Sequence, residues 1–321
     1  MPMLDMPLEQ LKTYQGTNPR PKDFDAYWDR ALAEMNAVDP QVELRPAKFQ
    51  PPFATAYNMF FTGMGGARVH AKVLKPKKAA KSHGAVLQFH GYGGYSGDWT
   101  PKLGYAAAGL TYAGLDCRGQ WGLSSDAGPV HVGNTHIGHF VRGMDEADPD
   151  KLFFRKMYLD TAQLAKIVME MDDVDPDRVG CFGGSLGGGL TLACAGLTPR
   201  MKLVSPVFPF LTDFQRGYQM DLCKDAYAEL RDYLRNRDTM CERREEIFTK
   251  LGYIDTHHLA ARIKGEVLMA VTLMDSICPP STQFAAYNRI TSKKNMVLFQ
   301  DFGHEWLPGF DDTTFEFMMG L

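Results

Sequence analysis

The stretch GCFGGSLGGGL at residues 180–190 constrains the fold of this chain more than any other. It contains Gly183-x-Ser185-x-Gly187, a pattern found where a strand turns sharply into a helix and exposes a serine at the apex. A short apolar run precedes the pattern, as in a strand, and the small, apolar residues 186–197 follow it, as in a buried helix. Glycine at both flanking positions allows the strand and the helix to approach closely. We predict a nucleophilic Ser185, with a purely structural tight turn as the alternative.

Apolar runs and helical patterns alternate along most of the chain. The runs expected to form strands are residues 84–88, 111–116, 178–182, 202–208, 266–273 and 296–299. The segments expected to form helices are residues 104–109, 151–171, 186–197 and 282–290, with a last helix from about residue 311. Strands that are apolar throughout are typical of a sheet covered on both faces, and their alternation with helices indicates βαβ units. We therefore predict an α/β fold with a mostly parallel, doubly wound sheet.

Two segments interrupt this alternation within what we expect to be one domain, residues 1–321. Residues 1–80 predict an N-terminal extension, in which a helix precedes an antiparallel hairpin region at about 42–74. Residues 211–264 are rich in polar helical stretches and predict a helical insertion that caps the sheet and lines a cleft or an oligomer contact. The N-terminal helix has an apolar stripe that we expect to pack on the core, formed by Phe24, Tyr27, Trp28 and Leu32.

Charge and composition argue against several classes of protein. The chain has 35 basic and 38 acidic residues, a net charge of −3 and no long run of like charge, so neither nucleic acid nor a membrane surface is expected as a partner. It has no apolar stretch of the ~20 residues that a membrane span needs, and its first residues lack the order of a secretory signal. The six cysteines have neither metal-site nor disulfide spacing. We therefore expect a cytoplasmic protein.

A serine nucleophile needs a histidine as base and a carboxylate that orients the histidine. Among the nine histidines, His304 follows the last expected strand, at the edge of the sheet where the carboxyl ends of parallel strands present their loops. Asp275 follows the strand at 266–273, and the order Ser185, Asp275, His304 is that of the α/β-hydrolases. Asp301 is the rival acid, but its closeness to His304 in the sequence fits a turn-capping side chain better.

The oxyanion of a tetrahedral intermediate needs two backbone N–H donors aimed at one point. The N–H of Leu186, the first residue after the serine, is one candidate, helped by the positive end of the following helix. The second is the N–H of Tyr92, because Gly91, Gly93 and Gly94 let that loop fold tightly against a ligand. A phosphate-binding loop is the alternative, but no Walker lysine follows these glycines.

The remaining histidine groups give weak signals for chemistry. His131, His136 and His139 could form a metal cluster, but no single helix would place them on one face and no H-E-x-x-H motif accompanies them. His257 and His258 lie in the expected insertion, where we expect a solvated or helix-capping pair. We therefore predict no metal ligands.

Several motifs in the chain resemble those of carbohydrate esterase family seven, the acetyl xylan esterases and cephalosporin C deacetylases of the α/β-hydrolase superfamily. The motifs that carry the resemblance are Arg118-Gly119-Gln120, the Gly183-Gly184-Ser185-x-Gly187-Gly188 elbow and His304-Glu305. Supporting similarity is found in PKDFDAYW at residues 21–28, in Tyr158-Leu159-Asp160 and in FPFLTDF at residues 208–214. The three core motifs in this order are highly specific, and the similarity extends from residue 21 to the end of the chain.

The resemblance implies a serine esterase that removes short acyl groups, chiefly acetate, from sugar hydroxyls and small alcohols. Acetylated xylo-oligosaccharides and cephalosporin C would be substrates, and no cofactor would be needed. The resemblance also implies an intracellular enzyme that forms a ring-shaped hexamer. It assigns Arg118 and Gln120 to the support of the active-site loops, whereas the residues by themselves are equally compatible with a salt-bridging turn.

Two positions depart from the family pattern. Leu186 stands where the family commonly has glutamine, so the backbone donor is kept and a side-chain contact is lost. Trp121 stands where the family commonly has glycine, and an indole facing the cleft would reshape the substrate pocket. Two other functions stay open at this point: another acyl hydrolase of the same fold, such as a peptidase or a longer-chain esterase, and a binding protein without catalytic activity.

Overall fold

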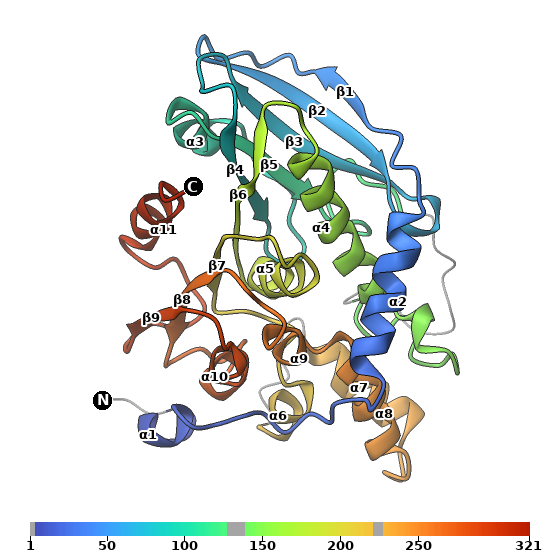
Figure 1. The fold of residues 1–321 in the computed structure, drawn as a ribbon. Coiled ribbons are helices and arrows are strands. Elements are labelled where there is room, and N and C mark those ends of the chain that lie inside the picture. The colour runs from blue at the N-terminus through green and yellow to red at the C-terminus, as the bar shows by residue number, and fades with distance from the viewer. Residues whose placement is uncertain (1–3, 127–138, 221–226) are drawn as a thin grey trace.

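The computed structural model describes residues 4–126, 139–220 and 227–321. Within these residues one sheet of nine strands runs through the molecule in the order β1-β2-β3-β5-β4-β6-β7-β8-β9 (Figure 1). The strands are β1 (Glu43–Pro46), β2 (Ala54–Thr62), β3 (Arg68–Pro76), β4 (His83–Phe89), β5 (Thr111–Asp116), β6 (Val174–Gly184), β7 (Leu203–Val207), β8 (Glu266–Thr272) and β9 (Lys294–Phe299).

Most of this sheet is parallel. All neighbours from β5 to β9 pair in parallel, whereas β1, β2 and β3 pair antiparallel with one another and β3 pairs antiparallel with β5. Every residue of β5 is buried, which is the pattern of a strand covered on both faces. The prediction of a mostly parallel α/β sheet is therefore confirmed.

Helices cover both faces of the sheet. In Figure 1, α4, α5 and α10 lie on one face and α3 and α11 on the other. The helices are α1 (Leu8–Leu11), α2 (Phe24–Asn36), α3 (Leu103–Ala107), α4 (Phe153–Met169), α5 (Leu186–Leu197), α6 (Phe214–Gln219), α7 (Ala228–Arg237), α8 (Arg244–Leu251), α9 (Thr256–Ala260), α10 (Pro280–Arg289) and α11 (Phe310–Met318).

Helix α2 packs on α4 through its aromatic stripe. Phe24, Tyr27 and Trp28 are fully buried, and the indole of Trp28 stacks on the ring of Tyr158 with 5.9 Å between ring centroids. Leu32 is only half-buried, and the buried stripe continues instead through Ala31 and Met35. The expected role of this stripe in core packing is confirmed for its aromatic residues.

The beginning of β6 differs from the prediction. The strand expected at residues 178–182 begins four residues earlier, at Val174, and contains a bulge before Val179. The pairing of β6 with β4 jumps from Val174 opposite His83 to Val179 opposite Ala85. The residues between are accommodated by a side-chain turn, in which the N–H of Asp177 donates to Asp175 Oδ1 at 3.0 Å.

His257 and His258 are buried, so of the two roles expected for them, a solvated or a helix-capping pair, the solvated one is wrong. They lie on α9 with exposed fractions of 0% and 2%. Asp255 caps this helix by accepting from the N–H of His257, and the same carboxylate oxygen lies 2.6 Å from His257 Nδ1. The pair is covered by the N-terminal segment, where a side chain added at Gly16 would lie 3.0 Å from His257 Nε2.

Candidate active site

The elbow predicted around Ser185 is present between β6 and α5. Ser185 has φ 58° and ψ −119°, a strained conformation for a residue other than glycine. Its N–H donates to the carbonyl of Val207 at 3.0 Å, which fixes the turn against β7. A Cβ atom at Gly183 or Gly187 would lie 2.5 Å or 2.1 Å from the carbonyl oxygen of Phe89. The two glycines are therefore required by the close approach of β4.

The fold brings three predicted side chains together at the carboxyl ends of the parallel strands. His304 Nε2 lies 2.9 Å from Ser185 Oγ, and His304 Nδ1 lies 2.8 Å from Asp275 Oδ2. The carboxylate can only accept, so Nδ1 carries the proton and Nε2 is the acceptor for the serine hydroxyl. This is the arrangement that lets a histidine act as a base toward a serine.

Asp275 is held rigidly below the histidine. It is fully buried, and its Oδ1 accepts from the backbone N–H groups of Ile277 and Cys278 at 2.8 Å each. The side chain of His304 is 16% exposed and lies against Phe208, with 4.5 Å between ring centroids. Asp301, the rival acid, is exposed, and the structure pairs His304 with Asp275 instead.

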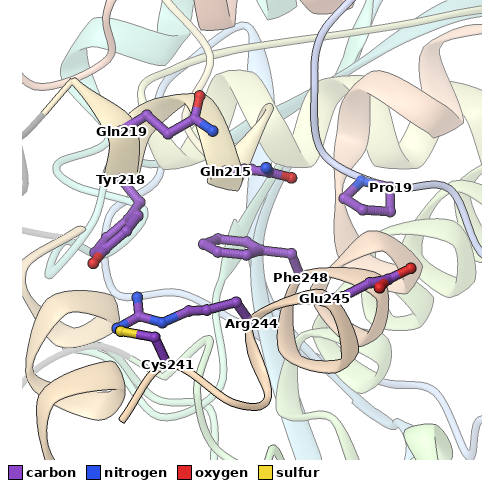
Figure 2. A pocket seen from close by; sticks show the side chains of 8 residues that line it. All are labelled: Pro19, Gln215, Tyr218, Gln219, Cys241, Arg244, Glu245 and Phe248. Atoms are coloured by element: carbon purple, nitrogen blue, oxygen red, sulfur yellow. The ribbon is translucent and has the colours of Figure 1, made fainter. Parts of the chain in front are cut away.

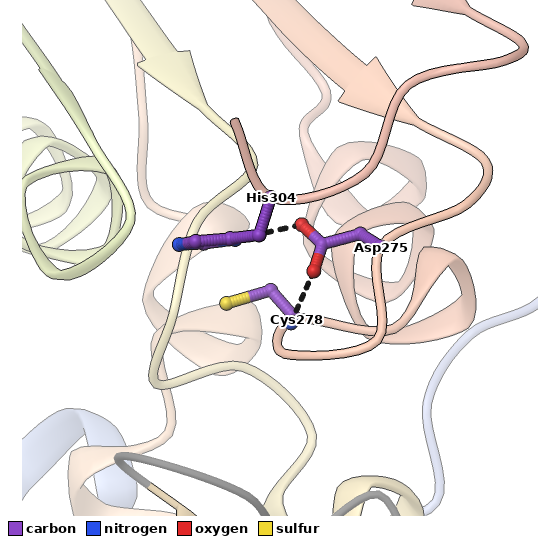
Figure 3. A group of neighbouring side chains, drawn as sticks. All are labelled: Asp275, Cys278 and His304. Atoms are coloured by element: carbon purple, nitrogen blue, oxygen red, sulfur yellow. Dashed lines mark hydrogen bonds and ion pairs between the residues drawn. The ribbon is translucent and has the colours of Figure 1, made fainter. Parts of the chain in front are cut away.

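Figure 3 shows Asp275 and His304 beside Cys278, whose sulfur belongs to the same cluster. The possible metal-binding atoms of these three residues lie within 4.8 Å of one another. Burial and the charge of Asp275 raise the pKa of the Cys278 thiol well above its ordinary value, so the sulfur stays protonated. A thiol binds a metal as the thiolate, and both oxygens of Asp275 already accept hydrogen bonds. These residues do not fit a metal site.

The two expected oxyanion donors lie on α5 and on the loop after β4, and this loop passes the elbow, because a Cβ atom at Gly91 would lie 3.9 Å from the carbonyl oxygen of Gly184. Leu186 is the first residue of α5, where a backbone N–H has no partner within the helix. Tyr92 lies in the loop that follows β4, and its ring contacts Phe210 at 6.4 Å between centroids. The side chain of Leu186 is fully buried, and it adds apolar packing to the core.

The loop that carries Tyr92 is fixed by two side chains. Gln120 Oε1 accepts from the N–H of Gly93 at 2.8 Å. His90, which the sequence analysis did not single out, lies 2.8 Å from the carbonyl of Gly91 through Nδ1, while its Nε2 accepts from the N–H of Cys117 at 3.0 Å. Burial lowers the pKa of His90, in agreement with the neutral ring that this pattern requires. Its position directly after an apolar strand was the available signal.

Arg118 forms a buried, bidentate ion pair with Asp160 of α4. Both N–O distances are 2.6 Å, and Nη1 of the arginine also donates to the carbonyl of Met64 at 2.9 Å. Burial opposes the charge, but the paired carboxylate raises the pKa of Arg118. The ion pair thus ties the segment that carries Gln120 and Trp121 to α4 and to the turn after β2. The indole of Trp121 is 76% exposed.

His139 forms a hydrogen bond with the same segment. Its Nε2 lies 2.8 Å from the carbonyl of Gly119, and burial lowers the pKa of the ring. His131 and His136, its partners in the weighed metal cluster, lie outside the described residues.

A groove of about 500 Å³ lies between α6 and α8 (Figure 2). Arg244 borders it, with Nη2 donating to Cys241 Sγ at 3.3 Å and Nε 2.9 Å from Asp238 Oδ2. The lining residues are Pro19, Gln215, Tyr218, Gln219, Cys241, Arg244, Glu245 and Phe248. Ser185 and His304 are not among them, so this groove is separate from the candidate active site.

Across the described residues, every helix is too short or too polar to cross a lipid bilayer.

A serine at a strand-to-helix elbow, with its acid and histidine in the loops after β8 and β9, defines an α/β-hydrolase. The model of the acetyl xylan esterase family matches residues 1–321. The chain therefore belongs to the acetyl xylan esterase family, a family of carboxylic ester hydrolases.

Individual relatives agree with this assignment. The structure of acetyl xylan esterase 1 from Thermoanaerobacterium sp. JW/SL YS485 is 55% identical, with a TM-score of 0.96 over 98% of this chain and 99% of that one. The acetyl xylan esterase from Paenibacillus sp. R4 is 34% identical, with a TM-score of 0.92 over 98% and 99%. The acetyl esterase Axe7A of Xylanibacter ruminicola is 27% identical over 90% of this chain, which spans 64% of that protein's length.

Proposed function

We propose that this protein is a serine esterase that removes acetyl groups from acetylated sugars and small esters. The observation that carries the proposal is the continuous hydrogen-bonded series from Ser185 through His304 to Asp275 in a chain of the acetyl xylan esterase family. Acetylated xylo-oligosaccharides and cephalosporin C are the substrates that we propose to test.

Acylation begins with transfer of a proton from Ser185 Oγ to His304 Nε2 as the oxygen attacks the acetyl carbonyl carbon. Asp275 stabilises the resulting imidazolium through Nδ1. When the tetrahedral intermediate collapses, the bond from the carbonyl carbon to the alcohol oxygen breaks, and the alcohol leaves with the proton from His304. Ser185 then carries the acetyl group as an ester.

Deacylation repeats the sequence with water as the nucleophile. His304 removes a proton from water as the water oxygen attacks the acetyl carbon. The bond from this carbon to Ser185 Oγ then breaks, the proton passes from His304 to Ser185 Oγ, and the product leaves as acetic acid, which ionises to acetate in water. We assign stabilisation of the negative oxygen in both steps to the N–H groups of Leu186 and Tyr92. Loss of one such donor typically costs 10²–10³ in kcat, so their placement would account for a large part of the rate.

We propose that Trp121 contacts the alcohol portion of the substrate. Its indole is 76% exposed, and the preceding residue, Gln120, binds the loop that carries Tyr92. The exposed indole, next to this loop, would pack against the sugar ring, while the small acetyl group would occupy the space near Ser185.

Acetate release from p-nitrophenyl acetate tests the proposed function. Ser185→Ala should abolish turnover and leave the far-UV circular dichroism spectrum unchanged, and phenylmethylsulfonyl fluoride should label the wild type but not the variant. Retained turnover in Ser185→Ala would overturn the assignment. A panel of acetyl, butyryl and decanoyl esters and a dipeptide amide then separates an acetyl esterase from a longer-chain esterase or a peptidase.

We also propose that the chain is a single α/β-hydrolase domain, acts in the cytoplasm, forms a hexamer and needs no metal or other cofactor. Support comes from the family and from the thiols at Cys117, Cys181, Cys194, Cys241 and Cys278, each of which is free. Light scattering on the purified protein tests the hexamer, and activity after dialysis against a chelator tests the independence from metal.

A further inference from the structure

A buried glutamine on α10 bridges the two ends of the loop that carries Asp275. Gln283 is fully buried. Its Oε1 accepts from the N–H of Thr272 at 3.1 Å, where β8 ends, and its Nε2 donates to the carbonyl of Cys278 at 2.7 Å, where the loop ends. The side chain therefore links the first and last residues of the segment from which Asp275 projects.

The same amide reaches the carboxylate itself. Gln283 Nε2 lies 3.4 Å from Asp275 Oδ2, the oxygen that accepts from His304. The hydroxyl of Thr272 donates to this oxygen at 3.3 Å and lies 3.2 Å from Gln283 Nε2. Oδ2 is thus approached by three groups, of which only His304 belongs to the triad.

Helix α10 is itself held in place at its first turn. Asp5, from the N-terminal segment, accepts from the N–H of Ser281 through Oδ2 at 2.7 Å and from Arg216 Nη2 through Oδ1 at 2.7 Å. Arg216 Nε also donates to Ser281 Oγ at 3.0 Å. The helix begins with proline at its N-cap and has no side-chain cap of its own, so Asp5 supplies one from a distant part of the chain. Gln283 is therefore presented from a fixed helix.

The chemistry of these contacts selects glutamine. One end of the loop offers an N–H and the other offers a carbonyl, so the bridging side chain must accept at one end and donate at the other. Glutamate could accept from Thr272 but could not donate to Cys278, and it would place a second negative charge beside Asp275. Methionine fills a similar volume but makes neither hydrogen bond.

We propose that Gln283 is a positioning residue for the reaction, which holds the loop so that Asp275 Oδ2 faces His304 Nδ1. This inference rests on the proposed function of Asp275 and His304. A displacement of about 1 Å in a catalytic group can cost 10²-fold in rate. Removal of the bridge should therefore lower kcat by about 10- to 100-fold and leave KM within about twofold, because Gln283 lies behind Asp275 and does not contact substrate.

The test compares Gln283→Met with Gln163→Met on p-nitrophenyl acetate. Gln163 is the matched control, since it is 2% exposed, lies on α4 and donates to the carbonyl of Thr62 at 2.9 Å. Both variants lose a buried amide hydrogen bond, but only Gln283→Met should lose kcat. The low-field proton NMR signal of His304 Nδ1–H should be present in the wild type and in Gln163→Met, and weakened or shifted in Gln283→Met.

Gln283→Glu should lower kcat further than Gln283→Met. Asp5→Ala, which removes the cap of α10 without touching the loop, should lower kcat in the same direction by a smaller factor and keeps the proposal testable if the Gln283 variants do not fold. For each variant, the concentration of active sites is determined by titration with phenylmethylsulfonyl fluoride, and kcat is calculated per active site. The proposal is overturned if this kcat and the His304 signal match those of the wild type in Gln283→Met or in Asp5→Ala. Turnover by Ser185→Ala would instead overturn the proposed function.

Discussion

Acid is expected to destabilise the protein through His258, which lies on α9. The ring is 2% exposed, with centroids 3.8 Å from the ring of His257 and 5.6 Å from Phe24. Burial, followed by the charges of His257 and Arg289, lowers the pKa of His258 from 6.5 to about 3, and Asp255 opposes this change. Below pH 6.5 the unfolded chain therefore binds a proton that the folded protein does not bind until about pH 3.

The size of the effect follows from this difference in pKa. Because the unfolded state binds more protons between these two pH values, the free energy of unfolding falls as the pH falls, by about 1.4 kcal/mol per pH unit for one residue. At pH 4.5, the loss relative to pH 7.5 is about 3 kcal/mol from His258 alone. A loss of this size is a large share of the roughly 5–15 kcal/mol that stabilises a typical domain.

Urea unfolding of the wild type and of His258→Phe at pH 7.5 and pH 4.5 measures this contribution. Phenylalanine keeps the aromatic packing and cannot be protonated, so the wild type should lose about 3 kcal/mol more than the variant between the two pH values. The comparison requires equal denaturant m-values, which show that both proteins unfold to similar extents. Equal losses of stability in the two proteins would refute the reasoning.

Substitutions at three further positions test the segment after β5. Arg118→Leu should leave Asp160 buried without its partner and lower the free energy of unfolding by about 3–5 kcal/mol in urea titrations; a change below about 1 kcal/mol would contradict the role of this ion pair. Gln120→Leu should lower kcat about tenfold through the loosened N–H of Gly93, whereas Gln120→Glu, which still accepts, should lower it less; equal kcat values would argue against this contact. Trp121→Gly should raise KM for an acetylated xylo-oligosaccharide several-fold but leave KM for p-nitrophenyl acetate unchanged; an equal rise for both esters would exclude a contact specific to sugar.

Features that depend on local sequence were predictable. The parallel strands are continuous apolar runs, so β5 and β8 were located to within one residue of the structure. The elbow at Ser185 is encoded by Gly183 and Gly187, because a side chain at either position would clash with the carbonyl of Phe89. Because side chains that follow parallel strands meet at one edge, the sequence also led to Asp275 and His304, which the structure places in contact. Their catalytic roles stay a prediction.

Features that depend on which distant segments meet were missed or misread. Gln283 stands in a polar helix that no motif distinguishes, and only the packing of α10 against β8 brings it to Thr272 and Cys278. His257 and His258 follow polar stretches, and a solvated pair was one of the two roles expected for them, but the N-terminal segment covers them. A side chain's partners and burial are set by the whole chain, so its neighbours in sequence do not reveal them.

The sequence by itself determined the fold class, the elbow and the order of the three site residues, because each follows from local periodicity, glycine sterics and the geometry of strand ends. Only the tertiary structure decided that Asp275 pairs with His304 while Asp301 stays in solvent, and that Asp5, far away in the chain, caps the helix that supports Asp275. The physical reason is that hydrogen bonds and burial act over a few ångströms in space, irrespective of separation along the chain.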